Sequence, residues 1–171
     1  MSIASRAQSL IVDVNRPGKN MIRSLWDRLS AVPGGKAVFS RIVGQMAPYT
    51  GTVGAQIEEV RDGYARVSMR DRRAVRNHLN CVHAIALVNL AEITGNIAMA
   101  YSLPDDARFI VAGLRVDYVK KARGTIVGET DCPRVESSAK QSYEVPVVLR
   151  NEQGEEVARA VLETLIGPKK G

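Results

Sequence analysis

The sequence predicts an α+β domain in which a curved antiparallel sheet wraps one long central helix. The first observation is an almost unbroken run of apolar helix formers from about His83 to Met99, long enough for about five turns. The second is the alternation of apolar and polar residues on both sides of this run, which is typical of strands. Antiparallel strands around a single buried helix form an α+β fold.

The N-terminal part of the chain has a helical pattern. Apolar residues recur every three to four positions in segments 1–15, 21–29 and 36–46, and a proline follows each segment. We therefore expect residues 1–46 to form a helical extension and residues 47–171 to form the domain that contains the sheet. The apolar faces of the extension are expected to pack on that domain, and peripheral contact with a membrane is the alternative.

Strand patterns follow in order. Residues 52–60 and 64–70 predict two strands joined by a tight turn at Arg61-Asp62-Gly63, because Asp-Gly favours a short hairpin loop. The central helix is expected to end near Pro104. Four further strands are predicted after it, at 109–121, 125–132, 143–150 and 155–166. In the first of these, alternate apolar residues are expected to share one face: Ile110, Ala112, Leu114, Val116 and Tyr118.

Composition limits the class of protein. The chain has 171 residues and 45% hydrophobic content, which suits one domain with a real core. Residues 1–20 lack the apolar run of a secretory signal, and polar residues interrupt the central helix too often for a membrane span. We expect a soluble cytoplasmic protein with no integral membrane segment. Its two cysteines, Cys81 and Cys132, are then expected to be free thiols.

The net charge of +6 comes largely from clustered basic residues. Two groups stand out: Arg61, Arg66, Arg70, Arg72, Arg73 and Arg76 in one window, and Lys120, Lys121 and Arg123 in another. Either group can be an ordinary solvated face, or it can bind a ligand that carries phosphate. Nucleic acid is not expected as a partner, because aromatic residues make up only 5% of the chain and no binding motif for nucleic acid is present.

Three strongly polar residues lie within the central helix. Asn89, Glu92 and Asn96 follow one another at helical spacing, so they form one narrow line on its surface. A buried carboxylate is costly unless it is paired or hydrogen-bonded. Glu92 is therefore either a structural acid held by its asparagine neighbours or a working one.

Three polar residues before and within the helix are separated by intervals that match a known motif. His83 follows Asn77 by six residues, and Glu92 follows His83 by nine. With the order of elements, this resembles the hotdog-fold acyl-CoA thioesterases of the phenylacetate-degradation type, and also a hotdog domain family without assigned function. The resemblance covers about residues 47–166 and implies a hotdog fold, a small-molecule acyl thioester as substrate and dimers with shared sites. It implies no cofactor, since coenzyme A would be part of the substrate.

One departure from the resembled motif lies directly after His83. The family has two glycines there, whereas this sequence has Ala84-Ile85. Glycine allows closer approach to the backbone than alanine or isoleucine. The side chains at these positions would therefore hold a substrate carbonyl away. For this reason a non-catalytic hotdog module that binds acyl-CoA or a fatty-acyl ligand is the alternative to an acyl-CoA thioesterase.

The chemistry of thioester hydrolysis assigns a role to each candidate. Unpaired amides near His83, Ala84 and Ile85 would donate to the developing oxyanion, and Glu92 would act as general base or nucleophile. Nine residues at about 100° each place His83 and Glu92 on opposite sides of the helix. Two antiparallel copies can bring them together, so we expect a homodimer or a dimer of dimers.

The remaining candidates each have a plain structural alternative. By the resemblance Asn77 would orient water or the ligand, but its side chain can also cap the loop before the helix. His83 can be a cap residue, and Cys81 is expected to be a small buried residue rather than a thiolate nucleophile. No metal site is expected from His78, Cys81 and His83, because they stand too close together and no further ligand cluster exists.

The basic residues are expected to meet the phosphates of coenzyme A if that is the carrier. The candidates are Arg72, Arg73, Arg76, Lys120, Lys121 and Arg123.

Overall fold

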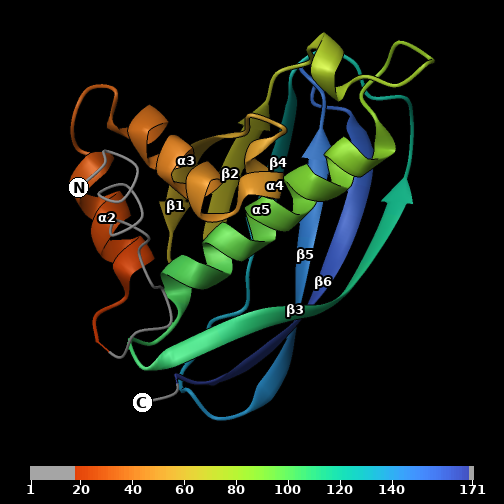
Figure 1. Cartoon of the computed structure of the whole chain (residues 1–171). Coiled ribbons are helices and arrows are strands. Elements are labelled where there is room, and N and C mark those ends of the chain that lie inside the picture. Colours follow the sequence, from red (N-terminus) through yellow and green to blue (C-terminus); the bar gives the residue numbers. More distant parts are fainter. Residues whose placement is uncertain (1–17, 170–171) are drawn as a thin grey trace, which may run out of the picture.

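A six-stranded antiparallel sheet curves around helix α5 (Ala84–Ser102) in the computed structural model of the chain, which describes residues 18–169 (Figure 1). The strand order is β1-β2-β4-β5-β6-β3, so β1 and β3 are the two edges. The strands are β1 (Gln56–Arg61), β2 (Tyr64–Met69), β3 (Ala107–Tyr118), β4 (Ile126–Asp131), β5 (Gln141–Arg150) and β6 (Glu156–Pro168). This confirms the predicted α+β class and the sheet wrapped around one helix.

The packing of α5 on the sheet is close. Leu90 and Met99 of the helix and Leu162 of β6 are fully buried in one apolar core. Gly95 faces the sheet, and a Cβ atom there would lie 2.8 Å from Leu162 Cδ2. Each fully buried leucine contributes roughly 1.5–3 kcal/mol to folding, so this contact between helix and sheet is a main source of stability.

The predicted hairpin is present, but its first strand starts later than expected. β1 and β2 pair antiparallel around Asp62-Gly63, and Gly63 has φ +73°, which glycine adopts without strain. The expected strand start at residue 52 is wrong. Pro48–Gly51 forms the short helix α4, and the chain then turns at Gly54 with φ +64° before it extends.

Edge strand β3 contains a bulge that the alternation did not predict. The pairing with β6 runs Ile110 to Leu165 and Val111 to Thr164, then resumes at Gly113 with Glu163, so Ala112 is the extra residue. The bulge reverses the faces. Ile110 therefore points to the outside of the sheet with Leu165, whereas Leu114, Val116 and Tyr118 point to the helix side. The expected single apolar face is wrong.

The N-terminal helices pack on the open side of the core. They are α2 (Met21–Leu29) and α3 (Gly35–Met46), and the helix expected over residues 1–15 lies outside the described residues. Trp26 and Phe39 meet edge to face with ring centroids 5.1 Å apart, and both are buried. The apolar side chains of Trp26 and Phe39 are therefore buried between the two helices and not exposed on an outer surface.

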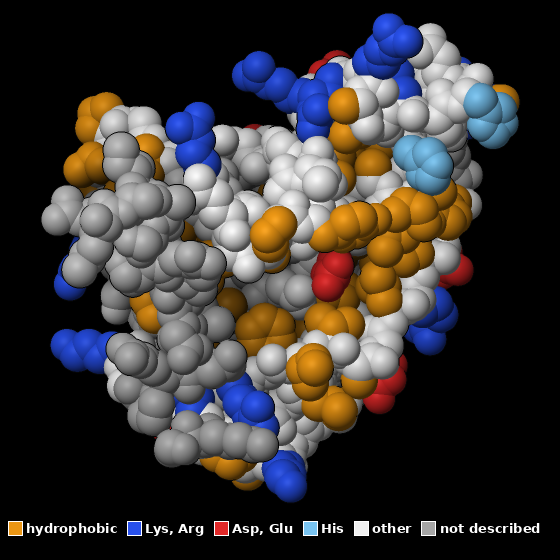
Figure 2. Space-filling model, viewed as in Figure 1, with side chains coloured by type: hydrophobic (Ala, Val, Ile, Leu, Met, Phe, Trp, Pro, Cys, Tyr) orange, Lys and Arg blue, Asp and Glu red, His pale blue; other side chains and the backbone are white. Residues whose placement is uncertain are grey.

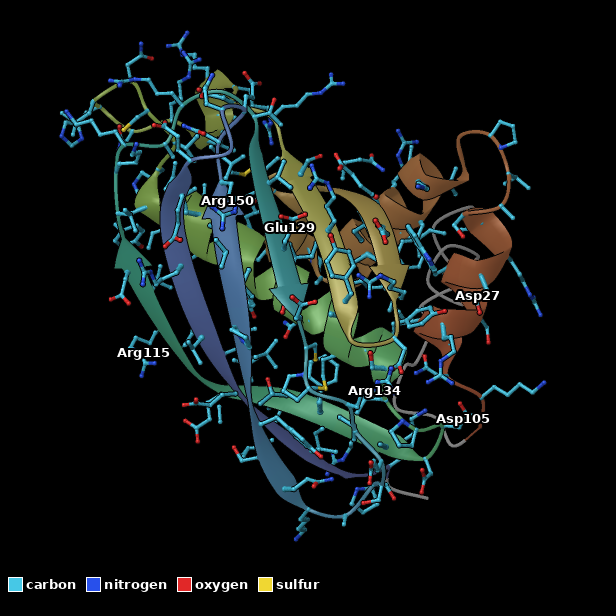
Figure 3. The ribbon with its side chains drawn as sticks, turned by 180° about the vertical axis from the view of Figure 1, so that it is seen from behind. Asp27, Asp105, Arg115, Glu129, Arg134 and Arg150 are labelled. Atoms are coloured by element: carbon cyan, nitrogen blue, oxygen red, sulfur yellow. The ribbon has the colours of Figure 1, made fainter. Side chains whose placement is uncertain are left out.

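Polar contacts fix α2 to the end of α5. The Asn20 amide Nδ2 donates to Ala100 O at 2.8 Å and to Leu103 O at 3.0 Å, which satisfies carbonyls that the helix end leaves free. The Tyr101 hydroxyl donates to Asp27 at 2.9 Å. Figure 3 shows Asp27 and Asp105 on this side of the molecule, away from the outer face of the sheet that carries Glu129.

Helix α5 has the length and apolarity of a membrane-spanning helix, with a mean hydropathy of 1.3 over its most apolar window. In the fold it is the core helix, and 61% of that window is buried inside the protein. Its apolar composition is accounted for by the sheet and the helices packed around it.

Candidate active site

The start of α5 is capped by the histidine that precedes it. His83 adopts extended backbone angles, and its Nδ1 accepts a hydrogen bond from the Ile85 amide at 3.1 Å. In this contact Nδ1 is the hydrogen-bond acceptor of the ring, and Nε2 is the nitrogen left to donate. The amides of Ala86 and Leu87 donate to the His83 carbonyl at 2.9 and 3.1 Å. His83 is thus an N-cap, as the structural alternative for this residue proposed.

Only one amide of the expected set is left to bind an oxyanion. The His83 amide donates to Val75 O at 2.8 Å, and the Ile85 amide is taken by the imidazole. The Ala84 amide has no partner among residues 18–169. The expectation of three available donors is wrong, because the cap and the bond to Val75 each satisfy one of them.

Asn77 organises the loop that leads to the helix. Its Oδ1 accepts from the Leu79 amide at 2.9 Å and from Cys81 N and Sγ, each at 3.4 Å. The side chain therefore acts as the hub of a turn, which is the structural alternative given above. Within this part of the fold its Nδ2 has no protein partner and is the group that could reach a ligand.

The two cysteines are buried and free, as expected. Cys81 is only 4% exposed, and its thiol lies 3.4 Å from Asn77 Oδ1. Burial, with a smaller effect of the Asp62 charge, raises the pKa of the Cys132 thiol to about 12. That thiol stays protonated at neutral pH and is no nucleophile. In the part of the chain that the structure describes, no three His, Cys, Asp or Glu side chains converge as metal ligands.

Glu92 lies half-buried on the side of α5 that the sheet leaves open, in line with Ile85, Val88 and Asn96. No hydrogen bond or ion pair joins its carboxylate to a residue in the described range. Asn89 instead donates to Tyr49 O of α4 at 3.3 Å. The expectation that Asn89 and Asn96 hold the carboxylate is therefore not met. Asn89 is turned about 60° around the helix from Glu92, toward α4.

Exposed apolar side chains lie on the open face of α5 that carries Glu92 and on the neighbouring edge strand β3. Ile85 of α5 is 50% exposed, and Leu114 and Tyr118 of edge strand β3 are 36% and 51% exposed. The Tyr118 hydroxyl donates to Ala84 O at 3.3 Å, which joins the strand edge to the start of the helix. Figure 2 shows a band of apolar side chains over this face, with acidic atoms beside it. The surface thus presents one carboxylate in apolar surroundings.

The Ala84 amide and the Glu92 carboxylate cannot act on one substrate atom within a single chain. Eight residues of α-helix separate them by about 12 Å along the axis. In addition, the first amides of a helix point beyond its N-terminus, away from Glu92. The direction of the helix therefore calls for two chains if both groups are used.

The structure brings only part of the predicted basic set together. Arg76 and Arg123 line one hollow of about 460 Å³ at the loop end of the molecule, and Arg70, which the site prediction omitted, lines it too. Asp71 anchors this hollow, because its Oδ1 accepts from Arg76 Nε at 2.6 Å and its Oδ2 from the Gly124 amide at 3.1 Å. Arg70 belongs to the same basic window of the sequence as Arg76. Its sequence position alone did not indicate that it lies beside Arg123 in the fold.

The other basic candidates lie outside that hollow. Arg72 donates to Thr52 O at 2.7 Å, and Lys120 pairs with Glu155 at 2.9 Å, which lowers the pKa of Glu155. Arg73, in the short helix η1 (Arg73–Val75), and Lys121 are exposed and do not line it.

Comparison with known proteins gives a consistent result. The family model described as Domain of unknown function (DUF4442) matches residues 35–166. The crystal structure of the protein genomics APC5556 has a TM-score of 0.75 and 33% identity, over 86% of this chain and 98% of that one. PA5026 from Pseudomonas aeruginosa, a protein of unknown function called a probable thioesterase, has a TM-score of 0.69 and 23% identity, over 80% and 97%.

A thioesterase family protein from Silicibacter pomeroyi has a TM-score of 0.64 and 16% identity, over 75% of this chain and 96% of that one. No curated protein matches the sequence. These likenesses confirm the hotdog fold.

The cap at His83 gives a direct test of its role. His83→Ala should lower the free energy of unfolding by about 0.5–2 kcal/mol, because the Ile85 amide loses its acceptor. His83→Asn keeps a capping oxygen and should retain most of that stability. Urea denaturation of both variants measures the difference. Equal stability of wild type, His83→Ala and His83→Asn would contradict the capping role.

Proposed function

Because the chain belongs to the family called Domain of unknown function (DUF4442), which has the hotdog fold of thioesterases, we propose that it hydrolyses an acyl-CoA thioester. The observation that carries this proposal is Glu92. It is an acid without a protein partner in the described residues, placed half-buried among apolar side chains on the open side of the central helix. A structural acid in such surroundings would be paired.

Glu92 acts in this proposal as general base. Its carboxylate takes a proton from a water molecule, and the water oxygen attacks the thioester carbonyl carbon. The carbonyl oxygen gains the negative charge, and the Ala84 amide stabilises it by donating a hydrogen bond. The intermediate then expels the thiolate of coenzyme A, which takes up the proton, and the products are a carboxylic acid and a free thiol.

Two chains are needed to build this site, so the proposal includes a homodimer. β3 has a neighbour on one side only, and its other edge can pair with a second copy. The apolar residues Leu114 and Tyr118 lie next to that edge, and Ile85 lies on the adjoining helix. Antiparallel pairing would place the start of one α5 toward Glu92 of the other. Two such dimers could also assemble further.

The phosphates of coenzyme A are assigned to the hollow lined by Arg70, Arg76 and Arg123. Arg76 is already paired with Asp71, which orients its guanidinium, whereas Arg70 and Arg123 have no acidic partner within residues 18–169. Guanidinium groups bind phosphate oxygens through two parallel hydrogen bonds. The hollow lies beside the loop that leads to His83, at the same end of α5 as the Ala84 amide.

A second candidate function is a module that binds an acyl thioester without hydrolysing it. It is favoured by the side chains at Ala84 and Ile85 and by the His83 cap, which leave a single amide for the oxyanion. Turnover of acyl-CoA, followed as free thiol released, separates the two functions.

Glu92→Gln should reduce kcat by about 10²-fold or more with little change in melting temperature, because the amide keeps the shape but is no base. Glu129→Gln is the matched control, since Figure 3 places Glu129 on the outer face of the sheet, where it binds Arg66 and Tyr64. The control should keep the wild-type kcat. A Glu92→Gln variant that melts several degrees lower yet turns over normally would overturn the assignment.

The basic hollow is tested with two substrates that share an acyl group. Replacing both Arg70 and Arg123 with Gln should raise KM for acyl-CoA by about tenfold or more, because charge-assisted hydrogen bonds to phosphate are lost. The KM for the acyl thioester of N-acetylcysteamine, which has no phosphate, should not change. Lys121→Gln, outside the hollow, is the control. An equal effect on both substrates would assign the arginines a structural role.

A further inference from the structure

A cavity of about 280 Å³ lies between the N-terminal helices and the C-terminal half of α5. It is separate from the hollow lined by the arginines and is formed within one chain. Its walls are mainly apolar: Ile22, Val43, Met46, Ile93, Ile97 and Ala100. Apolar walls with a few polar groups are typical of sites for small hydrophobic ligands.

The cavity comes close to the proposed base along the open side of α5. Asn96 lines it and lies four residues from Glu92, one helical turn or about 6 Å along the axis. The Oδ1 atom of Asn96 is buried and has no hydrogen-bond partner among residues 18–169. A buried amide oxygen without a partner is costly. This unpartnered acceptor makes the end of the cavity next to Glu92 polar.

The opposite end is bordered by cations. Arg108 at the start of β3 and Lys169 after β6 line the cavity near Leu103, where α5 has ended. The Arg108 Nε donates to Pro168 O at 3.0 Å, and the residue is exposed. From Ile93 to Leu103 the helix rises about 15 Å. The cavity is therefore elongated along α5, with polar groups at its ends and hydrocarbon between them.

We propose that this cavity holds the acyl chain of the substrate, and that the N-terminal helices α2 and α3 form the wall that sets its length. This inference rests on the proposed thioesterase function, because it places the carbonyl of the substrate near Glu92 and the chain beyond Asn96. A cavity of about 150 Å³ accommodates a six-carbon ring, so 280 Å³ suits a chain of roughly ten carbons. Medium-chain, unbranched acyl groups are the substrate class.

The test fills the cavity from two different elements. Ala100→Phe on α5 and Val43→Phe on α3 should each lower the ratio of kcat/KM for decanoyl-CoA to that for butyryl-CoA by at least tenfold, since a long chain no longer fits. Met46→Ala, which enlarges the space, should shift the preference to longer chains. Val38→Phe is the matched control, because Val38 is 50% exposed on α3 and does not line the cavity. Its ratio should equal that of wild type.

Binding of decanoate to the full chain, measured by titration calorimetry, separates this inference from the proposed function. Wild type and Val38→Phe should bind decanoate, and the two filled variants should bind at least tenfold more weakly. If wild type hydrolyses no acyl-CoA but shows this binding pattern, the cavity is confirmed as the site for the acyl chain and the thioesterase proposal fails. If folded Ala100→Phe and Val43→Phe both keep the wild-type chain preference and decanoate affinity, the cavity is not the acyl site.

Discussion

The structure depends on the burial of one helix that is apolar on nearly every side. A single curved sheet covers only part of α5, and Gly95 lets Leu162 approach the helix backbone on that side. The opposite side keeps an open stripe that includes Ile85 and Glu92. The fold covers part of this remainder with α2 and α3, and in our proposal a second chain covers the rest. The same constraint thus accounts for the core and the cavity, and in our proposal also for the face that the second chain covers.

The direction of α5 links this constraint to the chemistry. Its first amides point beyond one end of the helix, while Glu92 projects sideways from the middle, about 12 Å along the axis from Ala84. His83 reduces the number of free amides at this end, because its Nδ1 accepts a hydrogen bond from the Ile85 amide at 3.1 Å. A site with one available amide and one carboxylate is sparse, and the burial of substrate between two chains would strengthen both interactions by excluding water.

Local sequence patterns predicted most elements, because helices and strands carry their own periodicity. The bounds of α2 match the expected segment 21–29, and α5 begins directly after His83 as expected. The bulge at Ala112 was missed, since it depends on the register with β6 and not on the alternation within β3. The cap of the Ile85 amide by His83 was one of the two alternatives open from the sequence, because it is a contact between near neighbours in the chain. The grouping of Arg70 with Arg123 was missed, because it arises from the packing of distant segments, which the order of residues does not specify.

The most direct test of the shared site is complementation between two inactive variants. Glu92→Gln removes the base, and Ala84→Pro removes the free amide at a position where proline is well tolerated, since His83 has φ −65° and ψ 140°. Each variant alone should be inactive. When the two variants are unfolded, mixed in equal amounts and refolded together, random pairing makes half of the dimers mixed. Each mixed dimer has one intact site out of two, so about a quarter of wild-type activity should return. A refolded mixture no more active than its components would contradict the site shared between two chains.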